Sequence, residues 1–258
     1  MNKICSSFKA SLLAFCFAIV SPIAQAQIQS DVGVLQFPAI GSWNGYLDNQ
    51  NYLECVNAGS SEVILRLIML SNVGVDLGRR DFSIAARASE HVDLNAYGIQ
   101  SAYGSYRLEK LSGSADTVAC GTAVYRTALT SAGRAVDYAF YLPVTNPQYE
   151  TRYGSFNTLD PENRGGKTYN WLSVTNLDSA SQTFLIELFD QTGTALTQYS
   201  LSNVAAGERR DVALGHDLET NGGLLPGLSR VSFTAGSPPF KAFVTRFGQQ
   251  DGEYRFAF

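Results

Sequence analysis

The chain has 258 residues and a formal net charge of −4 at pH 7, from 19 basic and 23 acidic side chains. An acidic balance argues against a protein that binds nucleic acid through its overall electrostatic field, because such binding needs a basic surface. The 23 glycines and the aromatic content of 12% suit a fold of many short strands and turns.

The first residues have the three parts of a secretory signal peptide. Lys3 and Lys9 give a positive segment, and Leu12 to Val20 is an apolar run too short to span a bilayer. Ala24-Gln25-Ala26 then fits the small-x-small pattern of a cleavage site. We therefore predict a signal peptide at residues 1–26 and an exported mature chain, periplasmic or extracellular. No later run is long enough to span a membrane.

Two stretches 119 positions apart (170 − 51) follow one pattern. Asn51 to Asn57 reads N-Y-L-E-C-V-N, and Asn170 to Asn176 reads N-W-L-S-V-T-N. Each alternates as a half-buried strand does and ends on a turn-forming asparagine. Six blocks match in the same order along the chain, so we predict two β-sandwich domains built to one plan, at residues 27–142 and 143–258.

The matching of the blocks gives expectations for individual positions. Ala88–Leu94 matches Ala206–Val212, and Ala123–Arg126 matches Phe243–Arg246. Gly104–Leu108 resembles Gly227–Val231.

Two cysteines remain once the signal peptide has been removed, Cys55 and Cys120. In an oxidising compartment an even number of cysteines usually pairs, and the separation of 65 residues (120 − 55) suits the bond between the two sheets of an immunoglobulin-like sandwich. The second copy has Val174 and Phe240 at the matched positions, as expected for a buried centre. A metal site is the weaker alternative, because two cysteines without a nearby histidine leave it incomplete.

The sequence offers little for catalysis. The two histidines, His91 and His216, stand in turn-like contexts, and no Gly-x-Ser-x-Gly elbow occurs. We therefore predict surface histidines, no catalytic residue and no enzyme activity. An acid pair for glycoside cleavage needs two carboxylates close together in a cleft, and sequence spacing alone does not show such a pair.

Carboxylates in turn-rich segments are candidates for calcium binding, which needs six to eight oxygen ligands. The best of them is the loop with Asp160, Glu162 and Asn163; Asp190 and the Asp251–Glu253 segment are others. The alternative is that these residues stabilise turns. We expect no cofactor, and the identity of any metal stays open.

Several aromatic residues lie outside the clearest core strands, namely Trp43, Tyr46, Tyr97, Tyr103, Tyr149 and Tyr153. Such rings either bind the flat faces of sugars or peptides at a surface, or fill sandwich edges and the contact between domains. Loops at sandwich ends often hold binding groups. We therefore take the segment after the first domain as the candidate ligand site, with Tyr149, Tyr153, Asp160, Glu162 and Asn163.

The paired N-[YW]-L strands, the apolar strand that follows each, and the A-x-E-x-x-D block resemble tandem immunoglobulin-like repeats of bacterial exported proteins. The resemblance implies an all-β fold of two tandem immunoglobulin-like β-sandwich domains after a cleaved signal peptide, and it carries no functional residue. The chain is also similar in size and domain number to periplasmic pilus-assembly chaperones, which use a basic cleft, whereas this chain is acidic.

These observations favour an exported, non-enzymatic module that binds or scaffolds an unknown protein or glycan of the cell envelope or surface. Two alternatives are a periplasmic chaperone-like protein for the assembly of surface subunits, and a carboxylate-dependent hydrolase with its site at the domain junction. No nucleic acid and no membrane span of the mature chain are expected.

Overall fold

The computed structural model describes residues 35–114, 116–130, 133–157, 167–214, 226–233, 236–250 and 253–257. The predicted signal peptide lies outside these ranges. Within them the chain forms sixteen strands and two short 3₁₀ helices, at Tyr46–Asp48 and Asn95–Tyr97. The predicted all-β fold is confirmed. No helix in the described ranges is long and apolar enough to cross a membrane.

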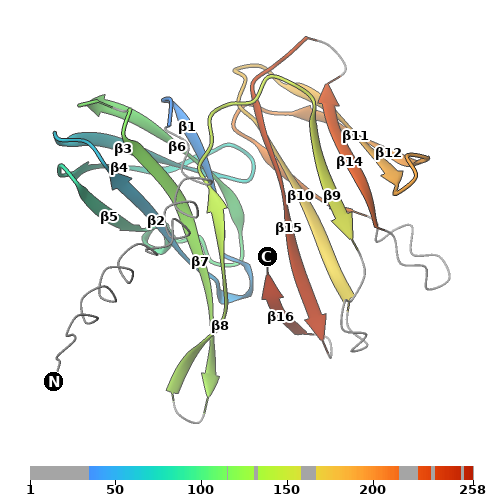
Figure 1. The fold of residues 1–258 in the computed structure, drawn as a ribbon, viewed down its shortest axis with the longest axis horizontal. Coiled ribbons are helices and arrows are strands. Elements are labelled where there is room, and N and C mark those ends of the chain that lie inside the picture. The colour runs from blue at the N-terminus through green and yellow to red at the C-terminus, as the bar shows by residue number, and fades with distance from the viewer. Residues whose placement is uncertain are drawn as a thin grey trace, which may run out of the picture. The chain divides into compact units, whose positions relative to one another are not determined.

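The first eight strands form two four-stranded antiparallel sheets, which we call the first sandwich (Figure 1). The sheet orders are β1-β6-β3-β4 and β5-β2-β7-β8. The strands are β1 (Ala39–Asn44), β2 (Gln50–Asn57), β3 (Val63–Ser71), β4 (Asp76–Ile84), β5 (Ala88–Asp93), β6 (Tyr103–Ser112), β7 (Val118–Thr130) and β8 (Gly133–Pro143).

The next eight strands form the second sandwich, coloured from yellow-green to red in Figure 1. Its sheet orders are β9-β14-β11-β12 and β13-β10-β15-β16, the same as in the first sandwich with every strand number raised by eight. The strands are β9 (Arg152–Asn157), β10 (Lys167–Asn176), β11 (Gln182–Asp190), β12 (Ala195–Val204), β13 (Arg209–Leu214), β14 (Pro226–Phe233), β15 (Phe240–Gln250) and β16 (Glu253–Ala257).

Each sandwich has its own buried apolar cluster between its sheets. Alternate residues of the central strands point inward, because successive side chains of a strand face opposite sides of the sheet. The first cluster includes Leu53, Leu65, Leu67, Met69 and Leu108, and the second includes Leu172, Phe184, Ile186, Leu188 and Phe240. Residues 34–258 form one compact unit, and the domain boundary between residues 142 and 143 stays a prediction.

The strand neighbours are partly those of immunoglobulin sandwiches. β2 lies beside β5, and β3 lies beside β6, as strands B and E and strands C and F do in that fold. The outer strands differ from that fold, where strand A pairs with B and strand G pairs with F. Here the first strand, β1, pairs with β6, and the seventh, β7, pairs with β2. β9 and β15 repeat this arrangement in the second sandwich.

The disulfide Cys55–Cys120 is present, but its location differs from the prediction. The two cysteines lie directly opposite each other on β2 and β7, with their Cα atoms 4.1 Å apart. The bond therefore joins neighbouring strands of one sheet and does not link the two sheets, because β7 pairs with β2. In the second sandwich Val174 lies opposite Ala242, so Ala242 and not Phe240 takes the position of Cys120.

The repeated asparagines do the same work in both sandwiches. The Asn57 side chain donates to the carbonyls of Ser61, Ile84 and Ala85 and accepts from the Gly59 amide. Asn176 makes the equivalent set of bonds to Ala180, Val204, Ala205 and Asp178. These buried amides close the turn after β2 and the turn after β10, as the sequence pattern predicts.

The other repeated asparagine joins the first strand of each sandwich to the second. Asn51 exchanges two hydrogen bonds with the main chain of Asn44 at the end of β1. Asn170 does so with Asn157 at the end of β9.

The matching of individual positions needs a correction of two residues along β7 and β15. Leu53 pairs with Thr122, and the corresponding Leu172 pairs with Val244, so Thr122 corresponds to Val244. The sequence blocks had placed Val124 there. A slip of two leaves every side chain on the same face, so alternation does not detect it.

The same correction applies to β5 and β13. Val92 pairs with Leu53 and Val212 with Leu172, so these two valines correspond. Matching Ala88–Leu94 to Ala206–Val212 had placed Arg210 at the position of Val92.

Candidate binding site

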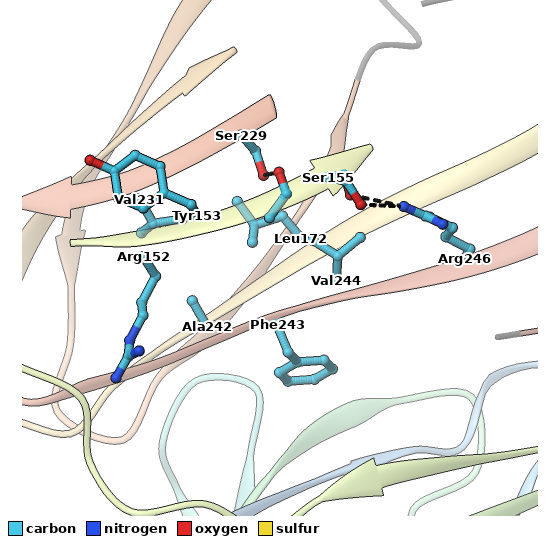
Figure 2. A pocket seen from close by; sticks show the side chains of 11 residues that line it. Arg152, Tyr153, Ser155, Leu172, Ser229, Val231, Ala242, Phe243, Val244 and Arg246 are labelled. Carbon is cyan, nitrogen blue, oxygen red and sulfur yellow. Dashed lines mark hydrogen bonds between the residues drawn. The ribbon is translucent and has the colours of Figure 1, made fainter. Parts of the chain in front are cut away.

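A pocket of about 280 Å³ opens between β9 and β15 of the second sandwich (Figure 2). We call it the β9–β15 pocket. Both sheets contribute to its largely apolar floor, with Gly154, Ser229 and Val231 from one sheet and Leu172, Ala242 and Val244 from the other. Arg152 lies at one end and Arg246 at the other, and Tyr153 and Phe243 complete the rim.

The first sandwich has a tyrosine ring at the equivalent position. Tyr106 pairs with Gly41 across β6 and β1, as Ser229 pairs with Gly154 across β14 and β9. The Tyr106 ring lies over Gly41, where a Cβ atom would overlap it, and is fully buried. Its hydroxyl is 2.8 Å from Thr122 Oγ1 on β7. The ring therefore fills the space between β1 and β7.

In the second sandwich this space is open. The Ser229 hydroxyl donates to the carbonyl oxygen of Gly154 at 2.9 Å and reaches no further. Val244 stands at the position of Thr122, so β15 offers a methyl group where β7 offers a hydroxyl. A Cβ atom at Gly154 would be 3.2 Å from its nearest neighbour, Ser229 Oγ. The replacement of tyrosine by serine thus accounts for the pocket.

The mouth between the two edge strands also differs. In the first sandwich Ile40 of β1 exchanges two main-chain hydrogen bonds with Thr145, at 2.9 and 3.0 Å. The amide of Val144 donates to the carbonyl of Cys120 on β7, and its side chain is buried in the core. Residues 144–145 therefore close this gap. In the described part of the chain β9 pairs with β14 only.

The charge at the rim is positive. Arg246 donates to the main-chain and side-chain oxygens of Ser155 and to Asn170 Oδ1, which holds it beside the pocket. Arg152 is exposed. No carboxylate is among the residues that line the pocket. An anionic group near the mouth is therefore favoured.

A second cavity, of about 390 Å³, is lined by residues of both sandwiches, among them Tyr46, Tyr103, Trp171, Arg209, Asp211 and Phe247. Its rings contact groups of the protein itself. The Tyr46 and Tyr103 ring centroids are 5.9 Å apart, and the guanidinium of Arg209 lies 5.0 Å from the Tyr103 centroid. The aromatic faces are thus partly occupied within the protein, as expected if Tyr46 and Tyr103 fill the contact between sandwiches.

Arg209 itself has no N–H left for a ligand. An arginine side chain has five N–H groups, and here all five are used. Nε and Nη2 each donate a hydrogen bond of 2.8 Å to the carboxylate of Asp211. Nη2 donates its second hydrogen to Ser173 Oγ at 2.9 Å. Nη1 donates to the carbonyls of Trp43 at 3.0 Å and Gly104 at 2.9 Å. Arg209 is 3% exposed and joins the second sandwich to the first.

Lys241 makes a similar connection. Its ammonium group donates to the carbonyl oxygens of Ile40 at 3.1 Å and Pro143 at 2.7 Å, and the residue is 1% exposed. Burial, and secondarily the positive charge of Arg209, lower the pKa of Lys241 to about 7. This lysine is a structural contact inside the protein rather than an accessible charge.

The predicted ligand residues separate in the structure. Tyr153 is 63% exposed and lines the β9–β15 pocket, whereas Tyr149 is 55% exposed and is not among the residues that line it. Asp160, Glu162 and Asn163 lie outside the described residues. Trp43 is one of the aromatic residues for which the sequence allows either surface binding or a structural role. It is buried, and its indole N–H donates to two carbonyls, which agrees with the structural role.

Sequence reasoning missed Ser229, although the signal was present. The blocks Gly104–Leu108 and Gly227–Val231 were matched in the register that the structure confirms, and this match sets Ser229 against Tyr106. A large core residue replaced by a small polar one is a sign of an open core.

The remaining candidates have other partners. His91 Nδ1 is 3.5 Å from Glu54 on an exposed strand, and His216 lies outside the described residues. Asp190 accepts three hydrogen bonds from Thr192 and Thr194, so it stabilises a turn. Among the described residues no group of three or more His, Cys, Asp or Glu is placed to hold a metal ion.

No family model and no curated protein matches the chain. Among solved structures it is similar to a glycosyl hydrolase family 2 member from Bacteroides cellulosilyticus, with 11% identity, 85% of this chain and 27% of that chain covered, and a TM-score of 0.19. It is also similar to Lactobacillus rhamnosus β-glucuronidase, with 11% identity, 85% of this chain and 34% of that chain covered, and a TM-score of 0.18. For Parabacteroides merdae β-glucuronidase the identity is 9%, the coverage is 88% of this chain and 28% of that chain, and the TM-score is 0.19. The chain spans about a third or less of these enzymes, and TM-scores this low support no argument about function.

Proposed function

We propose that this protein is an exported, non-enzymatic binding module of the cell envelope or surface, which takes its ligand in the β9–β15 pocket. The observation that carries this proposal is the difference between the two sandwiches. The fold is completed by Tyr106 in the first sandwich, and it is left open at Ser229 in the second. A pocket with an apolar floor and a few polar groups at its rim is the usual form of a ligand site.

The chemistry of the lining supports binding rather than catalysis. Nucleophilic catalysis needs a base beside its nucleophile. Here the Ser229 hydroxyl donates to a main-chain carbonyl, and the ionisable residues around it are arginines and a tyrosine. The disulfide Cys55–Cys120 suits an oxidising compartment, which supports export.

The two alternative functions have less support. A chaperone that anchors a terminal carboxylate needs an accessible cation in its cleft. In the cavity lined by both sandwiches the cation is Arg209, and its donors are all used within the protein. A hydrolase at the junction depends on Asp160 and Glu162, which lie outside the described residues.

Phenol is a suitable first probe because it is the smallest mimic of the ring that fills the first sandwich. We expect it to shift amide resonances of β9 and β15 in nuclear magnetic resonance spectra. Ser229→Tyr, which copies Tyr106, should abolish these shifts, and Ser229→Ala should preserve them. Shifts that survive Ser229→Tyr, or turnover of a glycoside or ester by the unmodified protein, would contradict the proposal.

A further inference from the structure

We propose that the ligand of the β9–β15 pocket is an extended segment of a partner protein, which pairs with the outer edge of β9 and places an aromatic side chain in the pocket. This inference rests on the proposed function and names the kind of partner. Three features of the second sandwich carry it: the outer edge of β9, which no strand of the described residues pairs with, the size of the pocket and the charge of the rim.

The first sandwich already contains such an arrangement within one chain. Residues 144–145 run along the outer edge of β1, where Thr145 exchanges two main-chain hydrogen bonds with Ile40. The neighbouring Val144 places its side chain in the core between β1 and β7. An extended segment at this edge is therefore a geometry that the fold accommodates.

The edge of β9 has the same register. Ile40 lies opposite Arg107 of β6, and Tyr153 lies opposite Arg230 of β14 at the equivalent position. In an antiparallel pair the main-chain groups of a residue point either toward the partner strand or away from it. The main-chain N–H and C=O groups of Ile40 point away from β6, toward Thr145. Because Tyr153 has the equivalent register, its main-chain N–H and C=O groups point to the outer edge of β9. An incoming strand finds its hydrogen-bonding groups there.

The size of the pocket selects an aromatic side chain. A dry engineered cavity of roughly 150 Å³ is enough to bind benzene, and the β9–β15 pocket measures about 280 Å³. Its counterpart in the first sandwich holds the ring of Tyr106. Because side chains alternate along a strand, one residue of the incoming segment points into the pocket while its neighbours point away.

The rim then favours acidic residues beside the aromatic one. Arg152 and Arg246 lie at the two ends of the pocket (Figure 2), and no carboxylate lines it. Arg246 already has partners within the protein, so the exposed Arg152 is the cation that an incoming carboxylate would meet. A segment with an acidic residue beside its ring would place the carboxylate near this guanidinium group, which forms strong charge-assisted hydrogen bonds.

The direct test uses a seven-residue peptide with a central tyrosine, flanking valine and threonine residues, and glutamate at both ends. Its binding is measured by calorimetry on the full mature protein. Replacing the central tyrosine by alanine should weaken binding by about tenfold or more, because the ring loses its burial. Replacing the glutamates by lysines should weaken it further. Equal affinity of the tyrosine and alanine peptides would overturn the proposal.

Variants of the protein test the pocket and the edge separately. Ser229→Tyr should abolish peptide binding and Ser229→Ala should retain it. If Ser229→Tyr is unstable, Ser229→Tyr with Val244→Thr restores the Tyr106–Thr122 pair and keeps the test valid. At the edge, Tyr153→Pro removes the outward N–H and should abolish binding, whereas Tyr153→Thr keeps that N–H and should bind the peptide.

N-methylation of the peptide bond on the carboxyl side of the central tyrosine, and separately of the bond on its amino side, tests the edge without altering the protein. At least one of the two should reduce affinity about tenfold, since one incoming N–H bonds to β9. Unchanged affinity for both methylated peptides and for Tyr153→Pro would overturn strand addition.

The outcomes separate this inference from the proposed function. If phenol binds and the peptide binds no tighter than phenol, strand addition is wrong and the binding module stands. If neither phenol nor the peptide binds, both are wrong. If the protein instead forms dimers that Tyr153→Pro abolishes, the occupant is a second copy of this chain, and the proposal of a separate partner is overturned.

Discussion

At the scale of single residues, two buried asparagines show how the fold holds polar groups in its interior. Asn57 and Asn176 close equivalent turns with equivalent hydrogen bonds. Buried polar groups lose water on folding and are tolerated only when they find such partners. The sequence shows an asparagine at the same place in both repeats. In the structure each side-chain amide donates to main-chain carbonyls, which an apolar residue could not do.

Lys241 leads to a prediction about pH. Its pKa is about 7 in the folded protein and about 10.5 in the unfolded chain. Between these values the unfolded chain binds the extra proton, so the free energy of unfolding should rise with pH, by up to about 1.4 kcal/mol per pH unit. The cost of the buried charge is therefore fully present below pH 7 and is relieved above it.

The measurement is chemical denaturation at pH 7, 8 and 9, for the natural protein and for Lys241→Met. We expect a steeper rise with pH in the natural protein than in the variant. Parallel curves would show that Lys241 keeps its proton when buried, held by the carbonyls of Ile40 and Pro143.

At the scale of strands, the disulfide closes a long segment of the chain inside one sheet. It constrains the unfolded state over a loop of 65 residues, which is worth about 2–4 kcal/mol. The second sandwich has Val174 and Ala242 in its place, so the two strands have no covalent link there. The two sandwiches should therefore respond differently to reduction.

Reducing agent, or the double change Cys55→Val with Cys120→Ala, should lower the unfolding midpoint of the first sandwich and leave that of the second unchanged. The double change copies the second sandwich, so it controls for the loss of packing. Resonances of β2 and β11 report the two sandwiches separately. Equal loss in both, or in neither, would contradict the assignment.

Alternation predicted the strands well but not their exact registers. It identified the strands around Leu53 and Leu172, and the repeat predicted that both copies follow one plan. The sequence matching of β7 with β15, and of β5 with β13, was wrong by two residues. The pattern of alternation does not reveal such an error, because a shift of two sets an inward-facing residue against another inward-facing residue. The pairing of β7 with β2, which places the disulfide within a sheet, depends on contacts between distant segments that no local pattern records.

The candidate site was predicted only in part. Tyr153 was named, because it stands in an aromatic segment at the predicted domain junction. The pocket beside it depends on the absence of a ring at Ser229, and a missing side chain gives no local signal. It emerges only when the two copies are compared in the correct register.

At the scale of the whole molecule, Arg209 holds residues of both sandwiches together. Its removal should be costly, because Asp211, whose side chain is 17% exposed, would be left without its partner and two carbonyls of the first sandwich would lose their donor. Breaking a fully buried ion pair costs about 3–5 kcal/mol, and the partial exposure of Asp211 places the cost here toward the lower end of that range. Lysine is no substitute, since it lacks the planar fork that meets four acceptor groups at once.

Arg209→Ala should therefore expose residues 144–151, between β8 and β9, to limited proteolysis, and Arg209→Lys should rescue only partly. Arg210→Ala is the matched control, because its side chain pairs with Glu208 and is less buried. Similar protease sensitivity of Arg209→Ala and Arg210→Ala would show that this connection contributes little.

The acceptors that Arg209 and Lys241 use in the first sandwich are all main-chain carbonyls, of Trp43, Gly104, Ile40 and Pro143. A carbonyl oxygen is present whatever amino acid occupies the position. Point substitutions in the first sandwich therefore cannot delete these acceptors, while a single substitution in the second removes one of the two cations. Among the described residues of the first sandwich only the Tyr103 ring, 5.0 Å from the Arg209 guanidinium, is a side-chain partner that substitution could remove. Random mutagenesis screened for separation of the sandwiches should therefore recover changes at Arg209 and Lys241 more often than changes in the first sandwich.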